Sequence, residues 1–353
     1  MRALMGKQGW AAVFLGVLLV AAGSGTLGWA AGSTYEIWVT NQATNKVQIL
    51  DGKTLEVIAE VATGSKPHNV TFTADDKHAW VPNVASNNVT VIEVASRKVV
   101  ATLPAGKTAH AVTFSPDGKR AYVANPGDGT VSVFDALKYD LVKTVAVGKA
   151  PALVTFSGDG KKAYVSNGGD ATLSVINTAT LEVAKTIPNV GKGAMGQVLT
   201  RDGRRLFVTG GGENKVSIVD TEKDAVVKDL VHGKEAHGVA LTADGRHVWV
   251  PNRQSGDISI IDVASGELVA TIPNVGDKTD IIAFSPDGTR AFVTTRGQAQ
   301  TGDPSLVTGK EPGISVIDVA SRSVIKKVPL VGGDPHGVAT RPVGGAPASG
   351  SAY

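Results

Sequence analysis

The sequence predicts an all-β fold, a seven-bladed β-propeller with four-stranded blades. Three observations support this prediction: a strand-like motif recurs seven times, its spacing is nearly constant, and the chain ends carry complementary parts of one repeat. The 353 residues include 42 glycines and only 5% aromatic residues. This composition suits many short strands joined by tight turns, because glycine adopts turn conformations at little steric cost.

The recurring motif is an aromatic residue followed by valine, a variable residue and most often asparagine. Its copies start at Trp38, Trp80, Tyr122, Tyr164, Phe207, Trp249 and Phe292. The steps between them are 42, 42, 42, 43, 42 and 43 residues. Each period also carries an apolar segment, a Ser-Pro-Asp-Gly type turn and two further short segments. Four strands in such a period are typical of a propeller blade, whereas a helical solenoid would show a 3.6-residue apolar period.

The predicted strands nearest to the chain ends complement each other. Residues 35–40 correspond to the second strand of a repeat, and residues 336–340 correspond to a first strand. We expect them to pair and so complete blade 1 from both ends, because closure of the ring removes open sheet edges. The propeller is then predicted to span residues 31–342, with a flexible tail over residues 343–353.

These repeats resemble the YVTN family of bacterial β-propellers. The segment Tyr-Val-Ser-Asn that starts at Tyr164 is close to the family consensus, and so are the alternating Val-Ser-Val-Ile-Asp type segments that follow such motifs. The resemblance covers essentially the whole chain after its first thirty residues. It implies a seven-bladed propeller but leaves the function open, because propellers carry unrelated activities on one scaffold.

The first thirty residues predict a cleaved signal peptide for the Sec route. Arg2 and Lys7 flank the start, an apolar stretch covers residues 10–22, and small residues at Gly28 and Ala30 suit cleavage after Ala30. An uncleaved anchor helix is the alternative, but the apolar stretch is short for a membrane span. We therefore expect a periplasmic or extracellular protein, monomeric and without a stable membrane anchor.

Composition excludes several function classes. The chain has no cysteine, which excludes disulfides, Cys-ligated zinc, an iron–sulfur cluster and a covalent c-type haem. The 35 basic and 32 acidic residues give a net charge of only +3, and no basic run accompanies the aromatics, so nucleic acid is not an expected partner. No nucleophile elbow or carboxylate pair at useful spacing stands out. Catalytic residues stay unassigned, and whether the protein is an enzyme stays open.

Functional residues are expected where the first strand of each blade begins, at the end of the central channel. We call these seven equivalent sites the mouth positions: His336, His68, His110, Ala152, Met195, His237 and Asp280. Imidazole, thioether and carboxylate are all metal ligands, and histidine with methionine favours copper, although another divalent metal stays possible. The set resembles the multi-histidine copper centre of nitrous oxide reductase, also a seven-bladed propeller, but with fewer histidines. In the alternative interpretation, the histidines are wedged between blades and bonded to backbone carbonyls.

An insertion in blade 7 lies on the same face. It covers residues 296–313 and is polar and rich in glycine and proline. Long loops in compact folds are commonly lids or binding loops, and a plain surface loop is the alternative. The candidate binding residues in it are Arg296, Asp303, Lys310 and Glu311.

Three function classes stay open. The first is an exported binding or scaffold protein that holds a periplasmic partner protein or a small ligand at the channel mouth. The second is a metalloprotein, either a copper-binding accessory factor or an oxidoreductase. The third is a haem d1-type or lyase-like propeller, in which one ring histidine acts as axial ligand or general base.

Overall fold

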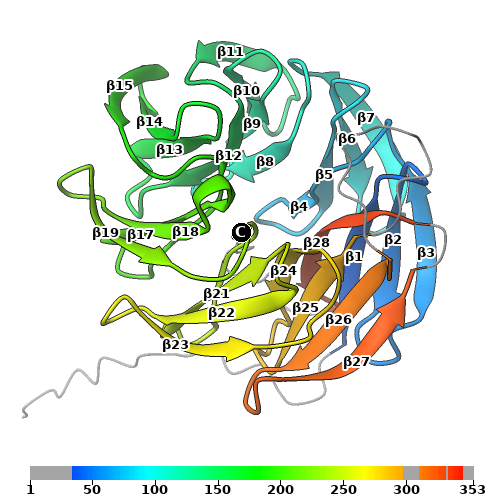
Figure 1. Cartoon of the computed structure of the whole chain (residues 1–353). Helices are drawn as coiled ribbons and strands as arrows, with labels where there is room; N and C mark the ends of the chain where they lie inside the picture. Colours follow the sequence, from blue (N-terminus) through cyan, green and yellow to red (C-terminus); the bar gives the residue numbers. More distant parts are fainter. Residues whose placement is uncertain (1–33, 297–309, 331–332, 345–353) are drawn as a thin grey trace, which may run out of the picture.

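The computed structural model describes residues 34–296, 310–330 and 333–344. Seven four-stranded antiparallel sheets are arranged in a ring (Figure 1), which confirms the predicted seven-bladed propeller. The described residues contain one short 3-10 helix, η1 (Gly211–Glu213), and none of their helices is long and apolar enough to cross a membrane. The predicted signal peptide and Asp303 lie outside the described residues, as does most of the predicted tail.

The strands fall into four layers from the channel outward. The inner strands are β28 (Pro335–Pro342), β4 (Thr71–Phe72), β8 (Ala111–Phe114), β12 (Pro151–Phe156), β16 (Ala194–Leu199), β20 (Ala240–Leu241) and β24 (Thr279–Phe284). The second strands are β1 (Tyr35–Asn41), β5 (His78–Asn83), β9 (Arg120–Asn125), β13 (Lys162–Asn167), β17 (Arg205–Gly210), β21 (His247–Asn252) and β25 (Arg290–Thr295).

The outer two layers follow the same order from blade 1 to blade 7. The third strands are β2 (Lys46–Asp51), β6 (Asn88–Glu93), β10 (Thr130–Asp135), β14 (Thr172–Asn177), β18 (Lys215–Asp220), β22 (Asp257–Asp262) and β26 (Gly313–Asp318). The outer strands are β3 (Val57–Ala62), β7 (Lys98–Pro104), β11 (Leu141–Ala146), β15 (Glu182–Ile187), β19 (Ala225–Val231), β23 (Glu267–Ile272) and β27 (Ser323–Pro329).

Blade 1 closes the ring as predicted. Strand β28 pairs antiparallel with β1, and Trp38 stands opposite Ala339. At the end of the seam away from the mouth, the Arg341 guanidinium donates to Glu36 at 2.9 Å and to Asp76 in blade 2 at 2.7 Å. Backbone pairing and these ion pairs together join the first and last described strands.

The core lies between neighbouring blades. The aromatic residue of each motif is buried, as Trp80 and Tyr122 show with no exposed surface. Both faces of the second and third strands pack against adjacent sheets, so their burial is continuous, as in β5 and β10, instead of alternating. Each fully buried aliphatic or aromatic side chain contributes roughly 1.5–3 kcal/mol through removal from water. The periodic motif therefore stabilises every blade boundary in the same way.

Two inner strands are shortened where a proline occupies the facing strand. Strands β4 and β20 have two residues each, and Pro82 and Pro251 lie in the neighbouring β5 and β21. Proline has no N–H to donate to a sheet, so regular pairing ends there. The preceding histidines, His68 and His237, still donate their amides to the Pro82 and Pro251 carbonyls, at 2.9 and 3.0 Å.

Candidate functional site

The mouth positions converge at one end of the channel. His68, His110, Ala152, Met195 and His237 line one cavity of about 30 Å³, whose remaining wall includes apolar side chains such as Leu153 and Val239. His336 and Asp280 adjoin this group, because the His336 ring stacks on His68 and the Asp280 carboxylate lies 3.0 Å from His237. The structure thus brings together the residues that the repeat alignment had placed on equivalent loops.

Three of the imidazoles form a stack. The ring centroid of His68 lies 3.6 Å from that of His110 and 3.7 Å from that of His336, with tilts of 38° and 44°. His68 is therefore the middle ring of a row. Among the described residues, the His, Asp and Glu side chains spaced for a shared metal ion are His237, Asp280 and His336, with ligand atoms within 4.8 Å of one another.

Backbone carbonyls of the next blade hold two of these rings. His110 Nδ1 lies 2.9 Å from the Ala152 carbonyl, and His336 Nδ1 lies 3.1 Å from the His68 carbonyl. A carbonyl can only accept, so Nδ1 of each ring carries a proton, and in neutral His110 the lone pair is on Nε2. This is the carbonyl-bonded arrangement of the alternative interpretation, and it leaves one nitrogen of His110 available to a guest.

Burial keeps the stack uncharged. It lowers the pKa of His110 to about 4. Burial, reinforced by the neighbouring rings, holds the pKa of His68 well below its usual value, and burial does the same for His336. Near neutral pH the imidazoles are therefore neutral, which is the form that binds metal ions or accepts a proton.

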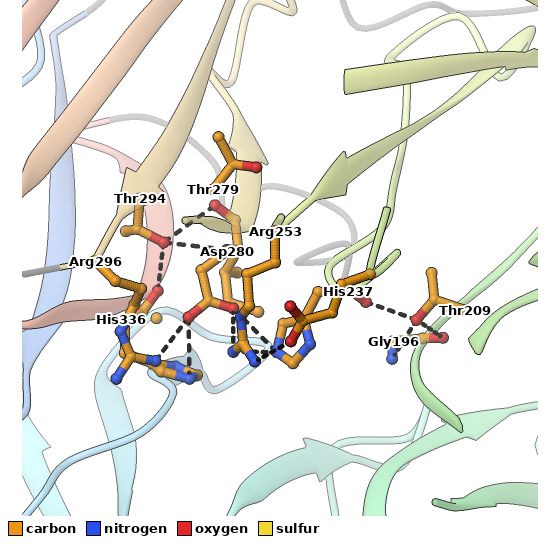
Figure 2. A network of polar contacts seen from close by, with 12 residues as sticks. Gly196, Thr209, His237, Arg253, Thr279, Asp280, Thr294, Arg296 and His336 are labelled. Atoms are coloured by element: carbon orange, nitrogen blue, oxygen red, sulfur yellow. Dashed lines mark hydrogen bonds and ion pairs between the residues drawn. The ribbon is translucent and has the colours of Figure 1, made fainter. Parts of the chain in front are cut away.

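The Asp280 carboxylate is the centre of a buried polar network (Figure 2). Its Oδ1 accepts from Arg253 at 2.8 Å and its Oδ2 accepts from Arg296 at 2.8 Å. Burial opposes ionisation, but the arginines and histidines around Asp280 hold its pKa well below the usual range. His237 Nε2 lies 2.8 Å from the Arg253 guanidinium and 3.0 Å from Asp280 Oδ1, so this ring belongs to the same network.

A second carboxylate ties this network across the seam. Asp334 accepts two bonds from Arg296, both 2.6 Å long, and Arg296 also donates to Gln42 at 3.1 Å. On the other side Arg253 pairs with Glu235 at 3.3 Å. Two arginines and three carboxylates thus carry a net charge of −1. Because both oxygens of Asp280 already accept from guanidinium groups, the His237–Asp280–His336 group is an ion-pair junction and not an open metal site.

The third motif residue positions the mouth residue of the next blade. Where it carries a hydroxyl group, that group donates to a mouth-position carbonyl: Thr40 to His68, Ser166 to Met195, Thr209 to His237 and Thr294 to His336. The Thr209 hydroxyl also accepts the Gly196 amide at 2.9 Å (Figure 2). Each hydroxyl thereby joins its own inner strand to the neighbouring blade. Pro82, Ala124 and Pro251 occupy the position elsewhere, without a hydroxyl.

The candidate loop residues separate in the structure. Arg296 lies in the buried network with 3% of its surface exposed. Lys310 and Glu311 are exposed at the far end of the insertion, where the Lys310 amide donates to Asp277 at 2.9 Å and the Glu311 carbonyl accepts from Thr295 at 2.7 Å. Neither of these two side chains belongs to the mouth network.

Sequence reasoning missed Arg253, Asp334 and Gln42. Arg253 and Arg296 both directly follow a second strand, a position that is uncharged in the other blades: Gln42, Val84, Pro126, Gly168 and Gly211. An alignment of the repeats therefore shows two arginines at one position in consecutive blades, which could have indicated a charged site there. Asp334, two residues before His336, has no such signal, because the corresponding residues vary in size and charge.

Comparison with protein families supports the fold and identifies two relevant groups. The model described as "Lactonase, 7-bladed beta-propeller" matches residues 30–227, more than half of the chain. The model described as "Cytochrome D1 heme domain" matches residues 194–295, which include Met195, His237 and Asp280. No curated protein matches the chain. The narrower YVTN assignment stays a prediction.

Several solved structures share the fold. Kuenenia stuttgartiensis hydrazine synthase has 22% identity and a TM-score of 0.67, covering 80% of this chain and 92% of that chain. A functionally unknown protein from Desulfotomaculum acetoxidans DSM 771 has 15% identity and a TM-score of 0.73, covering 86% and 98%. The dihydro-heme d1 dehydrogenase NirN in complex with DHE has 19% identity and a TM-score of 0.64, covering 86% and 74%. These identities establish similarity of fold alone.

Proposed function

Since the chain belongs to the seven-bladed β-propeller lactonase family, we propose that it is an exported binding protein whose channel mouth holds one soft metal ion. The observation that carries this proposal is the cavity itself. His68, His110 and Met195 line one small and mostly apolar space, and the centroids of the two tilted imidazole rings lie 3.6 Å apart.

The size of the cavity favours a guest of one or two atoms. A volume of about 30 Å³ is that of one or two water-sized spheres. A metal ion or a water molecule fits this space. A sugar lactone or a peptide side chain would have to lie outside it, on the face around the mouth.

The available donors favour a soft ion. His110 keeps its Nε2 lone pair, because Nδ1 is bonded to Ala152. His68 Nδ1 is buried without a hydrogen-bond partner, which costs free energy unless a guest engages that ring. Imidazole with thioether, and no open carboxylate, favours monovalent copper over zinc, magnesium or calcium.

A tetrapyrrole does not fit the described residues, although two of the matched names refer to haem d1. The cavity is far smaller than a macrocycle. Arg253 and Arg296, which could pair with the carboxylates of such a group, are already bonded to carboxylates of this chain. No step of the proposed function therefore involves haem.

Anaerobic titration with Cu(I) against a chromogenic chelator tests the proposal. We expect one ion per chain, a rise in melting temperature with added Cu(I), and a loss of affinity of about 100-fold in the His68→Gln/His110→Gln variant. Met195→Leu keeps the side-chain volume and should remove the copper–sulfur signal in X-ray absorption. The matched control is His78→Gln/His247→Gln, which alters two histidines at the starts of β5 and β21, away from the mouth. Absence of binding, or an equal loss in this control, contradicts the proposal.

Hydrolysis of a cyclic ester is a second candidate, favoured by the lactonase family match and by the tautomer of His110. A neutral ring anchored through Nδ1 presents Nε2 as a general base for water. A δ-lactone assay should then show a rate that is constant near neutral pH and falls as the pH approaches the His110 pKa of about 4. A rate that His110→Gln leaves unchanged excludes this role.

A further inference from the structure

A set of lysines surrounds part of the mouth at one repeated position. Lys107, Lys149, Lys192 and Lys234, here called the lysine crown, each lie three residues before a mouth position and follow a glycine. All four side chains are exposed. They belong to the loops that lead into blades 3, 4, 5 and 6, so the crown follows a continuous arc of the ring.

The backbone holds each lysine on the mouth face. The carbonyl of each crown lysine accepts an amide from the loop after the second strand of its own blade, as Gly127 donates to Lys107 at 3.1 Å and Gln254 donates to Lys234 at 3.0 Å. Lys149 and Lys192 accept in the same way, both at 3.0 Å. In each of these blades, the loop before the inner strand and the loop after the second strand are therefore hydrogen-bonded to each other at the crown lysine.

Three acidic side chains that adjoin the crown are bonded inward. The Asp128 carboxylate accepts from the Lys107 amide at 2.6 Å, and Asp170 accepts from the Lys149 amide in the same manner. Glu235 pairs with Arg253 in the buried network. These three carboxylates therefore face backbone amides and an arginine, and Glu213 on the same face pairs with Lys215 at 3.5 Å, whereas the crown side chains are exposed.

Lysines on the opposite face differ from the crown. Lys77, Lys119 and Lys161 each have an aspartate of the adjacent turn within ion-pair distance, at 3.6, 4.0 and 3.6 Å. In the crown only Lys149 has such a contact, at 3.9 Å with 84% of its side chain exposed. Over the described parts of the chain, Lys107, Lys192 and Lys234 have no carboxylate partner. Three of the four crown lysines are therefore exposed at the mouth without a carboxylate partner, and the fourth has one exposed contact.

We propose that the mouth face binds an acidic patch of a partner protein through Lys107, Lys149, Lys192 and Lys234. One positive charge on each of four consecutive blades, separated by short polar loops, matches carboxylates spread over a folded surface. The described loops of this face carry no Phe, Tyr or Trp on which nucleic-acid bases could stack. The crown also has no arginine, the residue that binds phosphate in a bidentate manner. The inference goes beyond metal binding and does not depend on it.

A labelled oligoglutamate peptide serves as the probe, with affinity measured by fluorescence anisotropy on the full chain without metal. The crown variant Lys107→Gln/Lys149→Gln/Lys192→Gln/Lys234→Gln should bind about tenfold more weakly, since several weak exposed ion pairs are lost together. Binding by the unaltered protein should weaken as NaCl rises from about 50 to about 300 mM, because salt screens exposed charges.

The matched control is Lys77→Gln/Lys119→Gln/Lys138→Gln/Lys161→Gln, which removes the same charge from exposed lysines away from the mouth. This control should keep its affinity for the peptide within about twofold. An equal loss in both variants overturns the proposal, since net charge alone would then explain binding. Tighter binding to duplex DNA or to phosphatidylserine vesicles than to the peptide overturns it as well. Unchanged Cu(I) binding by the crown variant separates this result from the metal site.

Discussion

The Nδ1–H group of His110 donates to the backbone carbonyl of Ala152 at 2.9 Å, across the boundary between blades 3 and 4. The equivalent bond from His336 to the His68 carbonyl crosses from blade 1 to blade 2. Mouth histidines are therefore part of the joints between blades and also carry the free nitrogens of the proposed site. Changes at the mouth should therefore affect both the stability of the fold and binding.

Acid should destabilise the fold through His110. The pKa of this ring falls from 6.5 to about 4 on folding because of burial. The unfolded chain thus takes up a proton below about pH 6.5 and the folded chain does not, so stability decreases as the pH falls toward 4, by roughly 2–3 kcal/mol. Urea unfolding across this pH range should show a smaller decrease for His110→Gln than for the unaltered protein. His78→Gln controls for the loss of one imidazole away from the mouth.

Neutralising Asp280 should weaken the ring at blades 6, 7 and 1. In Asp280→Asn, two buried guanidinium groups lose a charged acceptor, and breaking a buried ion pair from one side costs about 3 kcal/mol or more. Chemical denaturation should report this loss. The exposed Asp140 provides the control, because Asp140→Asn should change stability by less than about 0.5 kcal/mol. Equal stabilities for the two variants would contradict the role assigned to the network.

The seam should depend on the Glu36 carboxylate. Burial alone would raise the pKa of Glu36. Hydrogen bonds from Trp38, Arg97 and Arg341 lower it by more than burial raises it, so the net pKa lies below 4.5. Its contribution is then fully present above the unfolded pKa and is lost as the pH falls through the lowered folded value. Glu36→Gln should therefore be less stable than the unaltered protein near neutral pH and nearly equal to it in acid. If the stability difference between Glu36→Gln and the unaltered protein stays the same in acid, it results from lost packing and not from the lost charge.

His232 should be a destabilising residue. It is 8% exposed and neither ring nitrogen has a hydrogen-bond partner, while Val147, Val190 and Val275 occupy the corresponding position in other blades. Burial also lowers its pKa, so acid favours the unfolded, protonated form. His232→Val should raise stability by about 1 kcal/mol near neutral pH and by more in acid. Thermal unfolding at two pH values checks this, and an unchanged or lower melting temperature would argue against it.

Much of the fold could be predicted because each blade repeats the same four-strand pattern with a buried aromatic residue at the same position. The spacing from Trp38 to Phe292 revealed seven units, and the half-repeats at the two ends indicated the pairing of β1 with β28. Equivalent positions in a repeat occupy equivalent places in the ring. For this reason, alignment alone placed His68, His110, Met195 and His237 around one opening.

The sequence by itself determined the number of blades, the closure of blade 1 and the set of residues at the channel mouth, because these depend on periodicity. Only the tertiary structure decided how those residues act on one another. From the sequence, Asp280 is a candidate metal ligand. In the structure, Arg253 and Arg296 donate hydrogen bonds to its two carboxylate oxygens. Contacts of this kind join different blades at short range, and the periodic pattern does not specify which side chain of one blade faces which side chain of the next.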